Sequence, residues 1–297
     1  MGKKNKKVVA LAADLLGSLK MGDFKKAFPD RFVQVGISEA NMMGLAAGMA
    51  TQDLIPFTGT FANFSTGRVY DQIRQSIAYS GKNVKICASH AGLTLGEDGA
   101  THQILEDLGL MRMLPGMTVI NPVDSNQTRQ AVLAIAAHKG PCYLRFGRPN
   151  WPVFTPFDQT FEIGKAVTYG KGSDISLFST GHMTWQTIEA AQILEKEGIS
   201  CDVISLPTVK PLDDAAILKS VRKTKCAVVC EEHQVNGGLG DAVAHVVTSR
   251  YPVVIGYVGV NDSFGESGKP LELLDKYGLS VKAVIKKAKE VLKFKSK

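Results

Sequence analysis

Residues 35–50 read VGISEANMMGLAAGMA and are the most informative stretch of the sequence. An apolar run and a turn precede a helix that is rich in small residues, namely Gly44, Ala46, Ala47 and Gly48. Glu39 stands in the first turn, behind Ser38 as N-cap, where the helix dipole favours a negative charge. Glu39 could have no role beyond stabilising the N-terminus of this helix. The small residues, however, predict close approach by another backbone or a second subunit, which would bury this carboxylate at an interface.

Short β-type runs alternate with helical patterns on both sides of this stretch. Strands are expected at 8–12, 31–35, 84–88, 117–120 and 142–145, and helices at 38–51, 68–79, 105–113 and 124–138. Such alternation predicts a parallel sheet with helices on both faces, whose ligands bind beyond the carboxyl ends of the strands.

A second α/β unit is expected further along the chain. Its strands are predicted at 174–179, 201–205, 227–230 and 253–258, and its helices at 183–197, 213–221 and 239–249. A stretch rich in proline and aromatic residues separates the two patterns. The sequence therefore predicts two consecutive three-layer α/β/α domains, at 1–147 and 165–297, joined by a linker at 148–164 that packs its aromatic side chains on its neighbours.

The composition is that of an ordinary soluble protein, with 297 residues of which 44% are hydrophobic and 21% charged. The net charge is +7, but the first ten residues carry +4 and the last sixteen +6, so the remainder carries −3. We therefore expect a solvated lysine face on a final helix and no nucleic-acid partner. No apolar run reaches the length of a membrane span, and the start lacks a signal-peptide pattern, so no membrane association is expected.

The five cysteines lack C-x-x-C spacing and stand in apolar runs. Reduced, buried thiols in a cytoplasmic protein are the expectation, and no metal site is expected within the chain.

Two further segments carry candidate site residues. In GTFANF, Gly59 and Thr60 suit a loop that leaves a strand, and Phe61 and Phe64 could stack on a planar heterocycle or simply pack in the core. In GEDGATHQ, at 96–103, two glycines flank an acidic turn that leads to a histidine.

Three polar side chains of this region could line one pocket mouth. Asp98 and His102 belong to the GEDGATHQ loop, and His90 ends the preceding strand. Each could instead be an ordinary polar loop residue. Their joint position at strand ends of one sheet favours a site.

Arg148 follows another strand end in FGRPN, where a guanidinium suits a substrate phosphate. Ser18 stands four residues after Asp14 and is either a second phosphate contact or a plain loop serine.

In this order, the segments resemble the transketolase family of thiamine diphosphate enzymes. The resemblance covers nearly the whole chain, first a thiamine-diphosphate-binding-type parallel sheet, the pyrimidine-binding domain, and then a smaller sheet like the transketolase C-terminal domain. The run GSDISLFSTGHMTWQTIEAAQILEKEGISCDVISLPTVKPLD and the later CEEHQVNGGLGDAV carry the second part.

The resemblance implies a role for each candidate residue. Glu39 would be the catalytic glutamate that hydrogen-bonds N1′ of the aminopyrimidine and favours its imino tautomer. Phe61 and Phe64 would stack on the pyrimidine, and Asp14 and Leu15 would lie beside the thiazolium. His90 and His102 would be catalytic and, with Asp98, would hold the hydroxyls and phosphate end of the sugar. Arg148 and Ser18 would contact its phosphate.

The resemblance also implies a partner. The family's diphosphate-binding domain, with its GDG…Asn signature, is not found in this chain, which looks like the C-terminal subunit of a split transketolase. A separate N-terminal subunit would then hold the diphosphate and a Mg²⁺ or Ca²⁺ ion, in an α2β2 assembly that acts on phosphorylated sugars. Family members carry a helix before their first strand, and Met1-Gly2-Lys3-Lys4 resembles its last residues.

The implied reaction moves a two-carbon ketol unit from a ketose phosphate to an aldose phosphate. A 1-deoxyxylulose-5-phosphate synthase or the beta chain of a 2-oxoacid dehydrogenase shares the glutamate helix but differs at the Asp/His loop. A comparison of pyruvate with a ketose phosphate as donor would separate these enzymes. A non-catalytic partner subunit is the alternative from another class.

Overall fold

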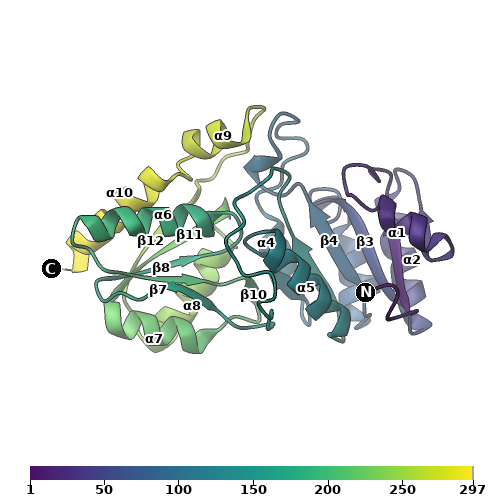
Figure 1. The fold of residues 1–297 in the computed structure, drawn as a ribbon, viewed down its shortest axis with the longest axis horizontal. Coiled ribbons are helices and arrows are strands. Elements are labelled where there is room, and N and C mark those ends of the chain that lie inside the picture. Colours follow the sequence, from purple (N-terminus) through teal and green to yellow (C-terminus); the bar gives the residue numbers. More distant parts are fainter. Residues whose placement is uncertain (296–297) are drawn as a thin grey trace.

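The polypeptide folds into two sheets that lie side by side, as Figure 1 shows for the computed structural model, which describes residues 1–295. Helices cover both faces of each sheet, which confirms the predicted class of two three-layer α/β/α units. The strands VVALA and ISLFS are buried at every position. Continuous burial of this kind is expected where helices cover a parallel sheet on both faces.

The first sheet has seven strands in the order β10-β5-β6-β4-β3-β1-β2. Neighbouring strands are parallel, except that β10 runs antiparallel to β5. The strands are β1 (Val8–Ala12), β2 (Phe32–Gln34), β3 (Ile55–Phe61), β4 (Lys85–Ser89), β5 (Thr118–Ile120), β6 (Cys142–Arg145) and β10 (Thr208–Lys210).

The helices of this unit divide between the two faces of the sheet. One face carries α2 (Glu39–Thr51), α3 (Tyr70–Gln72) and α4 (Asp107–Met113), and the other carries α1 (Gly22–Ala27) and α5 (Ser125–Ala137). The predicted single helix at 68–79 differs from the structure. It consists of a 3₁₀ turn, the short α3 and a π-helical segment, Ile73–Tyr79. Segments of π-helix often adjoin functional sites.

The second sheet has five strands in the order β12-β11-β8-β9-β7, with β7 antiparallel to β9. The strands are β7 (Val167–Gly170), β8 (Ile175–Ser179), β9 (Cys201–Ser205), β11 (Cys226–Gln234) and β12 (Val254–Val260). The helices are α6 (Met183–Lys196), α7 (Asp214–Thr224), α8 (Leu239–Arg250), α9 (Pro270–Lys276) and α10 (Val281–Lys295). In Figure 1, α6 and α10 lie above this sheet and α7 and α8 below it.

Two strands of the first sheet were not anticipated from the sequence. Gly59 and Thr60 belong to β3 itself and not to a loop that leaves it. Pro56 and the small polar residues of this strand obscure its β pattern, since proline is rare in central strands. β10 comes from the C-terminal half of the chain, where Thr208 pairs with Ile120 and extends the first sheet.

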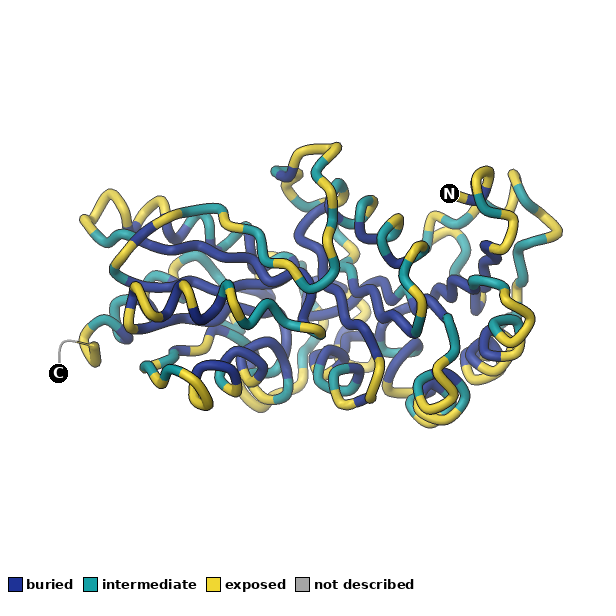
Figure 2. The backbone as a smooth tube through the Cα atoms, turned by 90° about the horizontal axis from the view of Figure 1, so that it is seen from below, coloured by how far each residue is buried: buried dark blue, intermediate teal, exposed yellow. Residues whose placement is uncertain are grey.

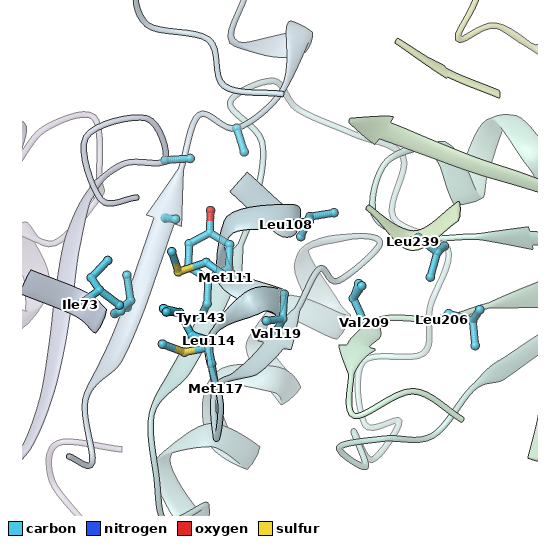
Figure 3. Packing of buried hydrophobic residues seen from close by; sticks show 14 of the residues in the cluster. Ile73, Leu108, Met111, Leu114, Met117, Val119, Tyr143, Leu206, Val209 and Leu239 are labelled. Atoms are coloured by element: carbon cyan, nitrogen blue, oxygen red, sulfur yellow. The ribbon is translucent and has the colours of Figure 1, made fainter. Parts of the chain in front are cut away.

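The largest apolar core continues from one unit into the other. Figure 3 shows Met111 and Tyr143 of the first unit, with Val209 and Leu239 from the C-terminal half in the same cluster. In Figure 2 the buried segments likewise run through the middle of the molecule, and the exposed ones lie on the outer helices and loops. Because the apolar area is shared, burying it stabilises both units and their relative placement.

A buried ion pair lies at the junction of the two units. Arg145, at the end of β6, donates through Nε to Asp107 Oδ2 at 2.8 Å and through Nη2 to the main-chain oxygen of Glu232 at 2.8 Å. The Tyr143 hydroxyl donates to the same carboxylate oxygen at 2.7 Å. Asp107 has no exposed surface, so these donors replace the water around Oδ2, while Oδ1 is buried without a hydrogen-bond partner among the described residues.

The stretch between the two units contains no helix or strand. Trp151 stacks on His182 of the second unit, with ring centroids 4.3 Å apart. Thr155 donates its main-chain N–H to the carboxylate of Asp124, which also caps α5 of the first unit. This segment is therefore held by contacts with both units.

The charged ends of the chain are exposed. α10 buries Val284, Ala288 and Val291, and Lys282 and Lys286 are exposed on it. Lys297, part of the expected lysine-rich end, lies outside the described residues. Among residues 1–295, no helix combines the length and the apolar character needed to cross a bilayer.

We predict that Asp107→Ala lowers the free energy of unfolding by about 3–5 kcal/mol, because it leaves the Arg145 charge buried without its partner. Urea denaturation followed by circular dichroism measures the change. Asp53→Asn is the control, since Asp53 forms an exposed ion pair with Lys7 and asparagine tolerates the positive φ of 60° at this position. Equal urea midpoints for the two variants would contradict the structural role of the buried pair.

Candidate active site

The residues predicted to form the site follow the carboxyl ends of adjacent parallel strands. The strands β6, β4, β3, β1 and β2 are neighbours in the sheet, so the segments that follow them meet at one edge. In that order along the edge, the candidate residues are Arg148, His90, Phe61, Asp14 and Glu39. The remaining candidates lie in loops that leave the same edge.

Glu39 is the first residue of α2 and is only 5% exposed. The side chain of Ser38 forms no capping hydrogen bond, so the expected N-cap interaction is absent at this described residue. The carboxylate instead accepts a hydrogen bond from Nη1 of Arg68 at 3.2 Å. Arg68 is 51% exposed, so the carboxylate lies just below the surface, beneath a side chain that can move.

Aromatic rings form one wall of the site. Phe61 stacks on the imidazole of His90, with ring centroids 3.9 Å apart and planes 18° apart. The ring of Phe64 lies 5.9 Å from that of Phe61 at 20°. The guanidinium carbon of Arg68 lies 4.1 Å from the Phe64 ring centroid. A planar group of nitrogen donors therefore contacts the Phe64 ring and hydrogen-bonds Glu39 at the same time.

His90 is held in an unusual backbone conformation. Its φ of +57° lies in the left-handed region, which is uncommon for residues other than glycine and often marks functional sites. Its Nδ1 lies 3.0 Å from the Ser89 hydroxyl. Burial, and then the positive charge of Arg148, lower the pKa of His90 to about 4, against a weaker opposing effect of Asp98. The imidazole is therefore neutral at pH 7 and can accept or donate a hydrogen bond.

The loop at 96–102 brings His102 to the same aromatic wall. The His102 ring meets Phe64 edge-on, with centroids 5.3 Å apart, and its Nδ1 lies 2.9 Å from the Thr101 hydroxyl. Asn63 donates to the main-chain oxygen of Thr101 at 2.8 Å, which ties this loop to the segment after β3. Asp98 is exposed on the loop. Its negative charge raises the pKa of His90, against the larger effects of burial and Arg148.

Arg148 contacts the same loop from the end of β6. Its Nη1 donates to the main-chain oxygen of Leu95 at 2.7 Å and to Oε2 of Glu97 at 2.6 Å. The ion pair is well exposed at both ends. An anionic ligand could therefore compete with Glu97 for the guanidinium.

Asp14, Leu15 and Ser18 lie at the same edge but outside the aromatic cluster. Asp14 and Leu15 both have positive φ, 54° and 38°, in the turn after β1. The side chain of Gln34 fixes this turn by accepting from the Asp14 N–H at 2.7 Å. Ser18 is exposed, and within residues 1–295 none of the three forms a hydrogen bond or ion pair with the cluster.

The small residues of α2 face in two directions. Ala46 and Ala47 are buried within this unit, whereas Gly44 and Gly48 are exposed. Among the described residues, nothing lies within 4 Å of a Cβ built at either glycine. The close approach that the sequence predicted at these glycines therefore does not occur within the chain, and a second subunit there remains a prediction.

One residue of the cluster, Arg68, was not identified as a site residue from the sequence. Its only signal is its position four residues after Phe64. For metals, no group of three His, Cys, Asp or Glu side chains within residues 1–295 could hold an ion.

Comparisons with known proteins agree on both units. The family model described as transketolase, pyrimidine binding domain, matches residues 1–153, and the model described as transketolase, C-terminal domain, matches residues 164–284. A Methanocaldococcus jannaschii protein named "Putative transketolase C-terminal section" is 42% identical over 296 residues, which cover 99% of this chain and 93% of that protein. The 6-deoxy-6-sulfo-D-fructose transketolase subunit SqwH of a Clostridium species is 42% identical over 294 residues, covering 99% and 91%.

A solved structure is similar throughout. It is described as a split gene transketolase, inactive beta4 tetramer, and superposes with a TM-score of 0.93 at 46% identity. The match covers 99% of this chain and 95% of that one.

We predict that Arg148→Ala raises the pKa of His90, because it removes the nearby positive charge that disfavours the imidazolium. Burial still holds the pKa below its ordinary value of 6.5. Protonation of His90 therefore opposes folding, and this histidine costs stability as the pH falls from 6.5 towards about 4. Imidazole NMR titration measures the midpoint, with Arg129→Ala as control. An unchanged midpoint in Arg148→Ala would show that the charge of Arg148 does not affect the pKa of His90.

Proposed function

The chain belongs to the transketolase family, and we propose that it is the C-terminal subunit of a split, thiamine-diphosphate-dependent transketolase. In this proposal it transfers a two-carbon ketol unit from a ketose phosphate to an aldose phosphate. Both family domains match in order, and relatives are similar over almost the entire chain. These matches support the family assignment, and the site geometry supports the reaction.

The contact among Glu39, Arg68 and Phe64 is the observation that carries the proposal. An aminopyrimidine is planar and carries ring and amino nitrogens, so it needs an acid partner at its edge and an aromatic ring at its face. The guanidinium of Arg68 already has both partners, Glu39 at 3.2 Å and the Phe64 ring at 4.1 Å. The residues present therefore fit the pyrimidine end of thiamine diphosphate, with Arg68 turning towards solvent to make room.

Bound thiamine diphosphate supplies the carbon nucleophile and the electron sink for cleaving and forming a carbon–carbon bond beside a carbonyl. Glu39 would hold a proton at the pyrimidine N1′, a task suited to a carboxylate shielded from water. Phe61 and Phe64 would fix the plane of the ring, and Asp14 and Leu15 would line the path beside the thiazolium. The diphosphate and its Mg²⁺ or Ca²⁺ ion would be bound by the partner subunit.

The polar side chains around the aromatic wall would bind the sugar. His90, neutral at pH 7, and His102 would hydrogen-bond and exchange protons with the hydroxyls next to the bond that breaks. Asp98 would orient the same hydroxyls. The guanidinium of Arg148 would break its ion pair with Glu97 and bind the anionic end of the substrate. Ser18 would form a second contact with the same anionic group.

The nature of the anionic group is a separate part of the proposal. The relative named for 6-deoxy-6-sulfo-D-fructose acts, by its name, on a sugar with a sulfonate. An exposed guanidinium can pair with a sulfonate or a phosphate, so Arg148 suits both. We favour the phosphate, and a sulfonated ketose is the second candidate donor.

Assembly with a partner subunit is a further part of the proposed function. The similar solved structure is described as an inactive tetramer of its beta chain. We propose that the present chain likewise associates through the face of α2 that exposes Gly44 and Gly48, and that an N-terminal subunit completes an active α2β2 enzyme in the cytoplasm.

The test of this function is a ketol-transfer assay with xylulose 5-phosphate, ribose 5-phosphate, thiamine diphosphate and Mg²⁺. We expect no turnover from this chain alone and turnover after addition of the diphosphate-binding transketolase subunit from the same organism. A sulfonated ketose and pyruvate are compared as donors. Turnover with pyruvate alone would reassign the enzyme, and absence of turnover in a stable complex would favour a non-catalytic subunit.

We predict that Glu39→Gln lowers the turnover of the assembled enzyme by at least about 10²-fold, because the amide cannot hold the proton at N1′. Assembly, measured by analytical ultracentrifugation, should be unchanged. Glu195→Gln, at an exposed position of α6, is the control. Turnover like that of the control would remove Glu39 from the mechanism.

A further inference from the structure

The loop at 96–102, which carries Asp98 and His102, lies against the second α/β unit. A Cβ built at Gly99 would lie 2.4 Å from the Ser267 hydroxyl, and one built at Gly96 would lie 3.3 Å from the ring of Pro270. Both glycines also have positive φ. Only glycine therefore allows this loop to lie so close to the segment at 263–270.

Gln103 forms the polar connection between the two segments. Its side chain is 5% exposed, and its Nε2 donates to the main-chain oxygens of Leu93, Gly96 and Glu266 at 3.2, 3.4 and 3.0 Å. The first two acceptors belong to the first unit, and Glu266 belongs to the second. The reverse orientation of the amide would place Oε1 against three carbonyl oxygens, so the donor side must face them.

The other side of the Gln103 amide is closed by Gly265. A Cβ at Gly265 would lie 1.9 Å from Gln103 Oε1, so any larger residue there displaces the amide. Oε1 has no hydrogen-bond partner among the described residues and is buried against this glycine. The position of Gln103 thus depends on a segment that contributes no residue to the candidate active site.

Two further bonds fix the chain on either side of the loop. Oε1 of Glu232 accepts the Thr94 N–H at 2.7 Å. The Gln234 N–H donates to the main-chain oxygen of Leu105 at 2.7 Å. Both partners stand on β11 of the second unit, so the stretch at 94–105 is attached to that unit at both ends and through Gln103.

Within the loop, the turn itself includes Gln103. The main-chain oxygen of Gly99 accepts N–H bonds from both His102 and Gln103 at 3.0 Å. A shift of the Gln103 main chain therefore moves the turn from which the His102 side chain extends. The Gln103 side chain also bonds the main-chain oxygen of Gly96, so it connects the two ends of the loop that carries Asp98.

We propose that the C-terminal domain has a specific task in this enzyme, namely to hold the substrate loop at 96–102 in its binding conformation, with Gln103 as the positioning residue. The inference rests on the proposed function insofar as it concerns sugar binding. Gln103 acts through His102 and Asp98 and does not itself touch a reacting atom. The C-terminal domain would thereby contribute to substrate affinity from outside the site.

The test uses two variants from opposite sides of the contact, in the assembled enzyme. Gln103→Glu keeps the shape of the side chain but removes the donor, and Gly265→Ala forces the amide to move. We expect amide hydrogen exchange at 96–103 to become about tenfold faster in both variants. We also expect KM for the ketose phosphate to rise roughly tenfold, with kcat changed less than about threefold and thiamine diphosphate affinity unchanged.

Glu266→Ala is the matched control, because Gln103 bonds only the main-chain oxygen of Glu266. Its side chain forms a surface ion pair with Lys276, and its removal should leave exchange and KM unchanged. Exchange at 96–103 that is unaltered in both test variants would overturn the proposal, as would acceleration spread evenly over the chain. If the wild-type assembly transfers no ketol unit, the proposed function fails, and the exchange comparison still decides whether the domain holds the loop.

Discussion

The guanidinium of Arg145 is the interaction on which the arrangement of the molecule depends. It is buried between the two α/β units and bonds a carboxylate of α4 on one side and a main-chain oxygen of β11 on the other. Removing a charge from water is costly, so such a group persists only where its partners are fixed. Arg148 stands only three residues after Arg145. The strand β11 also supplies the bonds that fix the substrate loop at 96–102. The fold and the candidate site therefore share one buried anchor.

The alternating pattern was sufficient to predict the class of fold, because parallel strands buried on both faces and amphipathic helices leave strong local signals. Most of the predicted elements have counterparts at nearly the same residues, for example α2 and β8. The features that escaped prediction are non-local or locally ambiguous. β3 contains Pro56, which argues against a central strand, and β10 is a strand only because β5 offers it an open edge. The apolar core shared by both units likewise depends on packing between distant segments.

The candidate site could be predicted in part for the same reason. Glu39, Phe61 and His90 stand at strand or helix ends, and topology alone brings such ends to one edge of the sheet. Their contacts could not be derived in this way. The guanidinium of Arg68 lies over Phe64, and Arg68 belongs to an irregular 3₁₀ turn that the helical pattern did not indicate. The role of Gln103 depends on a glycine far along the chain, and no pattern within GEDGATHQ indicates it.

The late strand β10 has a consequence for biosynthesis. On the ribosome, the strands β1 to β6 emerge first, and β5 then lies at the end of an incomplete sheet with its outer edge unpaired. Such an edge can recruit a strand from another nascent chain until its own partner is made. That partner, Thr208–Lys210, follows β9, so the first sheet is complete only after residue 210 has been translated. The two halves are therefore consecutive in sequence but share one sheet. Cutting the chain between them would leave β5 with an unpaired edge, which favours aggregation.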